Sequence, residues 1–318
     1  MHIVVTGGAG FIGANLCTHL LARPEIERVS VIDDLSTGFR TNLDGVDVRL
    51  REGSILDPDA LDEVIGDADA VIHLAARGSV PRSVADPLAS HHANATGTLQ
   101  VLEAARRAGD VQVVVASSSS VYGANPTLPK VEDMVARPMS PYAGSKLAAE
   151  SYTIAWQHTY GMPTLAFRFF NVFGPLQPAW HDYAAVVPAF VSAALAGRPL
   201  PVHGDGTQSR DFTYVATVCS VLTDAVVRRV TSDVPVNLAF GTRTSLLDVI
   251  ATLEDLLGHR LEVAHSPSRP GDVPHSQADN GRLRELFPTA APVPLRDGLA
   301  ATLEWFRTQP TEPVRSSS

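Results

Sequence analysis

Cysteine is scarce in this chain of 318 residues, which contains only Cys17 and Cys219. Two thiols so far apart in sequence exclude a disulfide framework or a cysteine-rich metal cluster. The 25 Lys and Arg residues are outnumbered by 34 Asp and Glu residues, and this net charge of −9 argues against nucleic acid and anionic membranes as partners. The sequence also lacks a basic, apolar signal segment and any apolar run long enough to span a bilayer. We therefore expect a cytoplasmic protein that binds neither nucleic acid nor membrane.

Hydrophobic residues make up 45% of the chain and charged residues 19%, which is typical of a folded protein with a large core. Short apolar runs, which we predict to be strands, occur at 3–6, 29–32, 46–50, 70–74, 111–116 and 164–167. Predicted helices alternate with them at 14–21, 59–65, 91–108 and 142–160. Strands that are apolar throughout and alternate with helices predict a parallel sheet covered on both faces. The expected fold class is therefore α/β, a Rossmann-type doubly wound parallel sheet.

The pattern changes after about residue 169, where turns rich in Gly and Pro appear. A strand at 236–239 and helices at 245–257 and 295–308 are predicted beyond them. This change predicts a smaller, loop-rich C-terminal domain, and such a domain beside a sheet usually supplies the substrate pocket. We assign 1–168 and about 211–244 to the nucleotide-binding domain, about 169–210 and 245–310 to the substrate domain, and 311–318 to a flexible tail.

Three glycines, Gly7, Gly10 and Gly13, directly follow the first predicted strand. In a dinucleotide-binding turn the first glycine allows the tight turn, the second lets the backbone approach a pyrophosphate, and the third permits close packing of helix on strand. Asp33 stands at the end of the second predicted strand, where a carboxylate binds the ribose hydroxyls and repels a 2′-phosphate. No arginine follows in the next three positions, so the motif predicts NAD rather than NADP.

Tyr142 and Lys146 are four positions apart in a predicted helix, which places both side chains on one face. The ammonium of Lys146 is expected to lower the pKa of the Tyr142 phenol, so that the phenol can act as a base near neutral pH. Ser117–Ser120 follow a predicted strand at its carboxyl end, where α/β sheets bind their ligands. Each feature alone is common on exposed helices and loops, but together with the glycine turn they indicate a catalytic site.

With these motifs, the sequence resembles the extended short-chain dehydrogenase/reductase superfamily, and within it the nucleotide-sugar epimerases and dehydratases. The resemblance runs from Thr6 to about Phe306 and is greatest to UDP-hexose 4-epimerases that also accept N-acetylated sugars. Further matching segments are 78–83, 168–175, 183–188, 204–206, 209–212 and 269–279.

The resemblance implies that Ser118, Tyr142 and Lys146 are catalytic and that Asn94 orders Lys146 through the active-site helix. No metal site is expected. The resemblance also implies that NAD contacts Gly7, Gly10, Phe11, Ile12, Gly13, Asp33, Asp34, Ser36, Thr37, Gly38, Ser54, Ile55, Leu74, Ala75, Ala76, Asn94, Tyr142, Lys146 and Phe169. It implies that the UDP-sugar contacts Gly78, Ser79, Ser118, Ser119, Tyr142, Asn171, Ala185, Val186, His203, Arg210, Arg269, Asp272 and Ser276. The helices at 91–108 and 142–160 are those that relatives use to form a homodimer through a four-helix bundle.

The implied reaction transfers a proton from the sugar O4 to Tyr142 and a hydride from C4 to the nicotinamide, and then returns the hydride to the other face. Ser276 occupies a position where a large Tyr excludes an N-acetyl group, so its small side chain predicts that UDP-glucose, UDP-galactose and their N-acetyl forms all react. Two positions depart from relatives: Ser54 replaces an Asp near the adenine, where Ile55 can still pack, and His203 replaces a frequent aromatic residue beside the uracil.

Three other functions stay open. A dehydratase needs an added acid and base, which relatives place directly after the catalytic Ser or Thr, whereas Ser119 and Ser120 follow here. A UDP-uronate epimerase or decarboxylase needs a cation near C6; Pro178 stands where relatives have Arg, although Arg77 or Arg82 could substitute. A non-catalytic dinucleotide-binding scaffold is less favoured, because the catalytic Tyr and Lys are both present.

Overall fold

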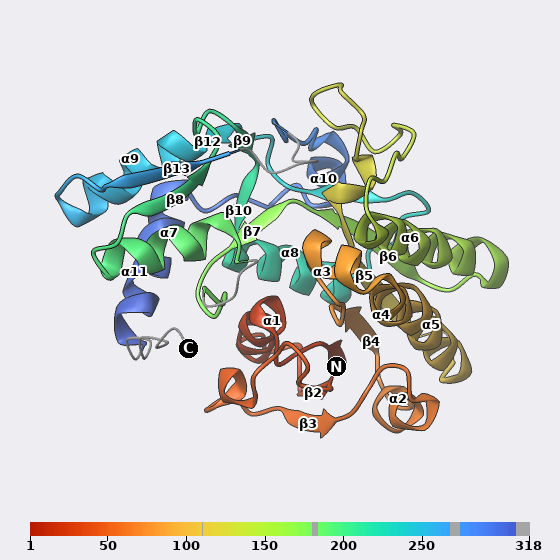
Figure 1. Ribbon diagram of the computed structural model, residues 1–318. Coiled ribbons are helices and arrows are strands. Elements are labelled where there is room, and N and C mark those ends of the chain that lie inside the picture. Colours follow the sequence, from red (N-terminus) through yellow and green to blue (C-terminus); the bar gives the residue numbers. More distant parts are fainter. Residues whose placement is uncertain (110, 180–183, 268–273, 310–318) are drawn as a thin grey trace.

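The computed structural model describes residues 1–109, 111–179, 184–267 and 274–309. Within these ranges the main sheet has seven parallel strands in the order β11-β6-β5-β4-β1-β2-β3 (Figure 1). Its strands are β1 (His2–Thr6), β2 (Arg28–Asp33), β3 (Arg49–Glu52), β4 (Ala70–His73), β5 (Gln112–Ser118), β6 (Thr164–Phe169) and β11 (Val236–Leu238). The predicted doubly wound parallel sheet is confirmed.

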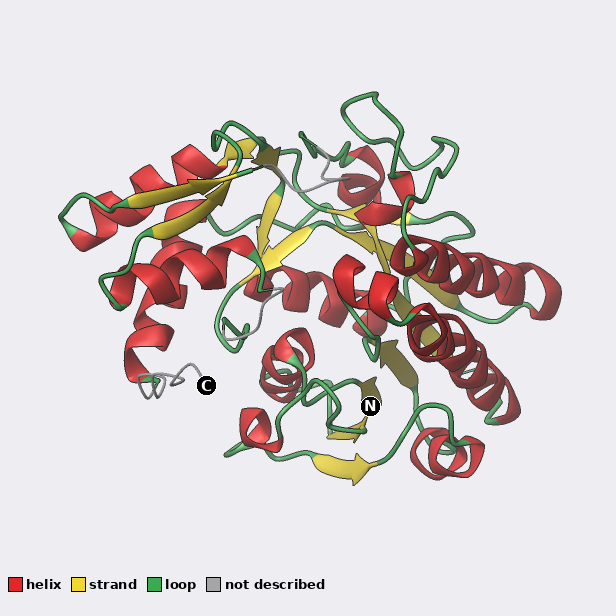
Figure 2. Ribbon diagram, viewed as in Figure 1, coloured by secondary structure: helices red, strands yellow, loops and turns green. Residues whose placement is uncertain are grey.

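Helices cover both faces of this sheet (Figure 2). Neighbouring residues of one strand point to opposite faces, so Val5 packs with one core and Val4 with the other. The core around Val5 includes side chains of α1 (Phe11–Leu21) and α8 (Val215–Val227). The core around Val4 includes side chains of α2 (Pro58–Ile65), α5 (Gly97–Arg107) and α6 (Pro141–Tyr160). Burial on both faces explains why these strands are apolar throughout.

Two predicted elements differ from the structure. The helix expected at 91–108 consists of α4 (Pro87–His91), a π-helical turn η2 (His92–Thr96) and α5, so the chain changes its helical register in the middle. The strand expected at 46–50 begins only at Arg49, because the backbone of Val46 and Val48 forms local turn hydrogen bonds instead.

The C-terminal part forms a smaller lobe beside the sheet, at the left of Figure 1. Its core gathers side chains of α7 (Val186–Leu195), α9 (Leu246–Leu257) and α11 (Leu295–Thr308). The short strand pairs are β8 (Leu200–His203) with β13 (Val263–Ser266), β7 (Asn171–Phe173) with β10 (Phe212–Tyr214), and β9 (Ser209–Arg210) with β12 (Thr244–Ser245). Helix α10 (Gly281–Leu286) returns to the main sheet beside β11, within a range that the sequence pattern assigns to the small lobe.

Among the described helices, none combines the length and the apolar character that crossing a bilayer requires.

Candidate active site

The glycine-rich turn after β1 forms a tight cradle at the start of α1. Gly7 has φ +72°, and a Cβ there would lie 2.6 Å from the backbone nitrogen of Ala75. A Cβ on Gly13 would lie 2.2 Å from the carbonyl oxygen of Gly7. No side chain caps α1 at Gly10, so the N–H groups of its first turn are available to an anion. The cradle therefore fits a pyrophosphate and tolerates no side chain at these glycines.

Asp33 closes the cradle at the end of β2. Its Oδ2 accepts a hydrogen bond from the Ala9 N–H (2.9 Å), and its Oδ1 accepts one from the Leu35 N–H (2.9 Å). Burial raises the pKa of this carboxyl, while the two N–H groups oppose that shift. Asp34, by contrast, is exposed and accepts hydrogen bonds from Ser36. The backbone of Phe39 and the side chain of Asn42, a residue not predicted from sequence, donate to the Ala9 carbonyl and tie the 36–39 loop to the cradle.

The three predicted catalytic residues lie together at the carboxyl end of β5. Ser140 caps α6 by accepting a hydrogen bond from the Ala143 N–H (3.1 Å), and the helix places Tyr142 in its first turn. The Tyr142 phenol lies close enough to Ser118, the last residue of β5, to interact with it. Lys146, one turn further, is buried and donates from Nζ to the carbonyl oxygen of Ala116 (2.8 Å). The spacing of four residues therefore puts both side chains on the face of α6 that packs against β5.

The expected lowering of the Tyr142 pKa by Lys146 is not found. Burial raises the pKa of the phenol, and the interaction with Ser118 opposes that shift. Burial also lowers the pKa of Lys146 to about 8. Both side chains are removed from water, and this burial favours the neutral form of each. The spacing of the two residues in the sequence gives no information about this burial.

A buried ion pair lies beneath this site. Arg168 of β6 contacts both carboxylate oxygens of Glu150, with Nε to Oε2 at 2.9 Å and Nη2 to Oε1 at 2.6 Å. The Ser117 hydroxyl donates to the same carboxylate (2.7 Å). Glu150 lies one turn beyond Lys146, so α6 is held against β5 at three successive turns. Sequence reasoning missed Glu150, although it continues the four-residue spacing of Tyr142 and Lys146.

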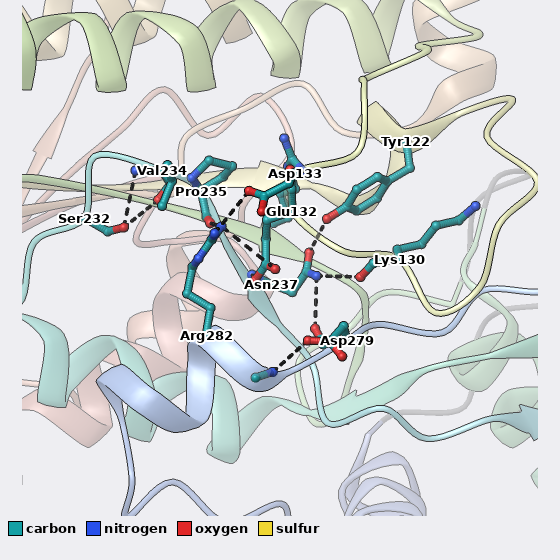
Figure 3. Close-up of polar contacts among 12 residues, drawn as sticks. Tyr122, Lys130, Glu132, Asp133, Ser232, Val234, Pro235, Asn237, Asp279 and Arg282 are labelled. Atoms are coloured by element: carbon teal, nitrogen blue, oxygen red, sulfur yellow. Dashed lines mark hydrogen bonds and ion pairs between the residues drawn. The ribbon is translucent and has the colours of Figure 1, made fainter.

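A second polar network ties down the loop that joins Ser118 to Tyr142 (Figure 3). The Asn237 side chain donates to the carbonyl oxygens of Lys130 (2.9 Å) and Asp279 (3.0 Å), and it accepts from the Tyr122 hydroxyl (2.6 Å). The Asn237 backbone N–H donates to Glu132 (2.8 Å). One buried amide thus joins this loop to the chain segment that contains Ser276.

A cavity of about 850 Å³ lies between α7, β7 and β8, which suits a drug-sized ligand. Its lining includes the predicted substrate residues Ser79, Asn171, Ala185, Val186, His203 and Arg210. Sequence reasoning missed four polar lining residues, Gln177, Ser192, Arg198 and Gln208. Within the described part of the chain, Gln177 Oε1 is buried and has no hydrogen-bond partner, which leaves an acceptor for a ligand. Its position two residues after Pro175 of the Gly174-Pro175 turn was the available sequence signal.

Other predicted site residues lie outside this lining. Ser118 and Tyr142 are not in the lining, although Ser118 pairs with Phe169 in the sheet and Asn171 of the lining follows two residues later. Gly78, Ser119 and Ser276 are not part of the lining either. Arg269 and Asp272 lie outside the described residues.

Asn94 bonds to helix α6 at Ser145, the residue that directly precedes Lys146. Its Nδ2 donates to the Ser145 hydroxyl (2.9 Å), and its Oδ1 accepts from the Arg77 N–H (2.7 Å). The π-helical turn sets this arrangement, because it turns Asn94 toward the residue that precedes Lys146.

The remaining predicted cofactor residues surround the cradle or its sheet. Leu74 and Ala75 donate from their backbone nitrogens to Thr6, and Ala76 follows them. The Ser54 hydroxyl accepts from the Leu56 N–H (3.1 Å). Ile55 is buried in the core, where it would clash with any side chain at position 97. No group of His, Cys, Asp and Glu in the described ranges has an arrangement suited to a metal ion.

The parallel sheet, the glycine cradle with its carboxylate, and the Ser-Tyr-Lys cluster define a dinucleotide-binding enzyme. The model of the NAD dependent epimerase/dehydratase family matches residues 3–239, and the chain belongs to this family. It is 37% identical to a UDP-glucose 4-epimerase of Mycolicibacterium smegmatis over 97% of this chain and 99% of that protein.

Solved structures agree with this assignment. A UDP-N-acetylglucosamine 4-epimerase from Methanobrevibacter ruminantium is 35% identical, with a TM-score of 0.91 over 96% of this chain and 98% of that one. A UDP-glucose 4-epimerase from Thermotoga maritima, solved with UDP-glucose, is 31% identical, with a TM-score of 0.89 over 96% and 99%.

Proposed function

We propose that this protein is an NAD-dependent isomerase that interconverts UDP-hexoses differing in configuration at C4. The observation that carries the proposal is the juxtaposition of Tyr142 with Ser118 at the carboxyl end of β5, in a sheet whose first turn forms the glycine cradle. A cavity of about 850 Å³ lined by Asn171 and Arg210 supports it. The relatives named above are 4-epimerases of UDP-glucose and UDP-N-acetylglucosamine, which supports the same reaction.

The cradle residues fit NAD. Gly7, Gly10 and Gly13 leave room for its pyrophosphate at the start of α1, and the buried Asp33 carboxylate favours free ribose hydroxyls over a 2′-phosphate. When bound, NAD supplies the acceptor for the hydride that leaves C4 and the donor that returns it.

The catalytic residues move and stabilise protons at the sugar O4. Tyr142 takes the proton of the 4-hydroxyl as its base, and the Ser118 hydroxyl hydrogen-bonds the same oxygen. Lys146, with a pKa near 8, retains a large fraction of its positive charge at neutral pH, which stabilises the phenolate that must form. After the 4-ketose has turned over in the cavity, Tyr142 returns the proton to O4 and no net oxidation results.

The nucleotide is proposed to lie along the cavity. Asn171 and Arg210 would bind the diphosphate together with the uncapped start of α7 at Ala185, while His203 of β8 would contact the base. Arg269 and Asp272 are proposed to complete the nucleotide contacts. Ser276 is proposed to leave space for an N-acetyl group, so both plain and N-acetylated hexoses should react.

A cytoplasmic homodimer is part of the proposal. Helices α5 and α6 run side by side (Figure 1). Tyr152, Trp156 and Tyr160 of α6 form a stripe with ring centroids 5.9 and 5.4 Å apart, and both tyrosines are exposed. A matching pair of helices from a second copy would cover this stripe in a four-helix bundle.

The other family reactions have less support from the described residues. A dehydratase needs a free acid, but Glu150 is held by Arg168 and Ser117. A uronate-specific enzyme needs a cation near C6, and one of the two candidates, Arg77, pairs with Asp86 at 3.3 Å. A binding-only scaffold does not require the contact between Tyr142 and Ser118.

The test is incubation of the purified protein, without added NAD, with UDP-glucose, UDP-galactose, both N-acetylhexosamine forms and UDP-glucuronate, followed by product identification. We expect each of the first four sugars to give its C4 epimer. Tyr142→Phe should lower kcat by roughly 10²–10⁴-fold while the protein still co-purifies with NAD. A 4-keto-6-deoxy or decarboxylated product, or unchanged turnover in Tyr142→Phe, would contradict the proposal.

A further inference from the structure

A buried histidine that the proposed reaction does not use lies between the cofactor cradle and the catalytic helix. His73 is the last residue of β4 and is only 3% exposed. Its Nδ1 lies 2.7 Å from the Thr6 hydroxyl, directly before the glycine turn. Its Nε2 lies 3.0 Å from the Thr98 hydroxyl on α5. Both ring nitrogens are therefore engaged by side chains from different elements.

The hydrogen bonds of this histidine have a defined direction. The Thr98 hydroxyl donates to the Asn94 carbonyl oxygen (2.6 Å), so it can only accept from His73, and Nε2 must carry the proton. Burial lowers the pKa of His73 to about 3, and the charge of Lys146 acts in the same sense, so the ring is neutral. Nδ1 then accepts from the Thr6 hydroxyl. Thr6 in turn accepts from the Ala75 N–H (3.1 Å).

Each half of this hydrogen-bond network around His73 ends at a different part of the site. On the Nδ1 side, the network ends at the backbone nitrogen of Ala75. A Cβ on Gly7 would lie only 2.6 Å from this nitrogen, so this half of the network borders the cofactor cradle. On the Nε2 side, the hydrogen-bond network continues through Thr98 to Asn94. The Nδ2 of Asn94 donates to the Ser145 hydroxyl (2.9 Å). Ser145 donates to the backbone carbonyl of Tyr142 (2.8 Å), so this half ends at the turn that carries the catalytic phenol.

We propose that His73 is a positioning residue with two separable tasks. Its Nδ1 holds the β1 and β4 ends of the cradle in register for the dinucleotide, and its Nε2 holds the Asn94–Ser145 contact that orients Tyr142. The proposal rests on the proposed NAD-dependent epimerase function. A histidine that only fills space would instead affect stability, without dividing cofactor binding from turnover.

Two amide substitutions separate the halves. An Asn oxygen can stand near the position of Nδ1, and a Gln nitrogen can stand near that of Nε2. His73→Asn should keep NAD bound but lower kcat by roughly 10–100-fold, because the catalytic turn loses its support. His73→Gln should raise the Kd for NAD about tenfold, the effect of losing one hydrogen bond, while kcat at saturating NAD stays near the wild-type value. The KM for the UDP-sugar should not change in either variant.

Two further variants supply a comparison and a control. Thr98→Val removes only the Nε2 half and should match His73→Asn. Thr153→Val removes an equally buried hydroxyl that donates within α6 to the Ala149 carbonyl (2.8 Å), so it should change neither NAD retention nor kcat. NAD retention is measured by absorbance after gel filtration of each purified variant, and folding by thermal melting.

The opposite phenotypes of the Asn and Gln variants would support the proposal. Equal loss of both properties in both variants, or wild-type values in both, would overturn it. If His73→Asn does not fold, a Thr98→Val protein with wild-type kcat would overturn it as well. A wild-type protein that retains NAD but epimerises no UDP-sugar would count against the proposed epimerase function. Even then, the NAD retention of the two His73 variants would test the proposed role of Nδ1 at the cradle.

Discussion

Replacing Glu150 with Gln would leave the Arg168 guanidinium without a full negative charge beside it. Arg168 is 4% exposed and Glu150 is 3% exposed, so water cannot replace the lost carboxylate. The Glu150 carboxylate also accepts a hydrogen bond from the Ser117 hydroxyl. The amide of a glutamine would direct its own N–H group toward either this hydroxyl or the Arg168 guanidinium, which are both donors.

The expected loss follows from this burial. Removing one partner of a buried ion pair destabilises a protein by about 3–5 kcal/mol, because an uncompensated charge stays inside. Arg168 keeps two further contacts, a hydrogen bond to the Glu132 carbonyl (3.0 Å) and stacking on the Tyr122 ring (4.6 Å). We therefore expect Glu150→Gln to lower the free energy of unfolding by about 3 kcal/mol, the lower end of that range.

Chemical denaturation with urea, followed by fluorescence, measures this loss. Asp224→Asn is the matched control, because it breaks an exposed pair with Arg228 at 2.6 Å and should change stability by about 0–1 kcal/mol. The double variant Glu150→Leu with Arg168→Met should recover most of the stability, since it removes both charges. A single variant that loses no more than the control, or a double variant no better than the single, would refute the reasoning.

Three further changes have defined outcomes. Gly13→Ala should abolish NAD retention, because its Cβ would lie 2.2 Å from the Gly7 carbonyl oxygen. The control Gly45→Ala should retain NAD, because a Cβ there would have no atom within 4 Å. Equal NAD retention in the two variants would count against the cradle. Lys146→Met should be more stable than the wild type at pH 7, because the buried ammonium has a pKa of about 8 against its ordinary 10.5. Between about pH 8 and 10.5 the unfolded chain binds more protons than the folded one, so the wild type gains stability as the pH rises. The stability difference between the variant and the wild type should therefore shrink. Urea titrations at pH 7 and 10 measure this difference, and a constant value would contradict the prediction. Ser276→Tyr should reduce turnover of UDP-N-acetylglucosamine more than that of UDP-glucose, and an equal effect on both sugars would contradict the proposed gate.

The sheet was largely predictable because its signals are local. Six of its strands were expected from apolar runs, and the seventh, β11, was expected as a strand at 236–239. Helix α6 was located within one residue at its start, and the four-residue spacing predicted Tyr142 and Lys146 on one face of it. These features depend on backbone geometry that repeats every two or four residues.

Other features depend on contacts between distant segments. The partner of Asn94 follows from a π-helical turn that no apolar period indicates, and Arg198 enters the cavity lining only through the packing of the small lobe. The Glu150–Arg168 pair joins a helix to the neighbouring strand, so each residue alone resembles an ordinary surface charge in the sequence.

The order of strands and helices, the glycine turn with its carboxylate, and the shared helix face of Tyr142 and Lys146 could be predicted from the residues alone. The way those groups titrate and the contacts that hold them, including the raised pKa of Tyr142 and the buried position of His73, depend on how the chain folds. The reason is physical: hydrogen-bond periodicity is a property of neighbouring residues, whereas desolvation is set by every chain segment that excludes water from the same place.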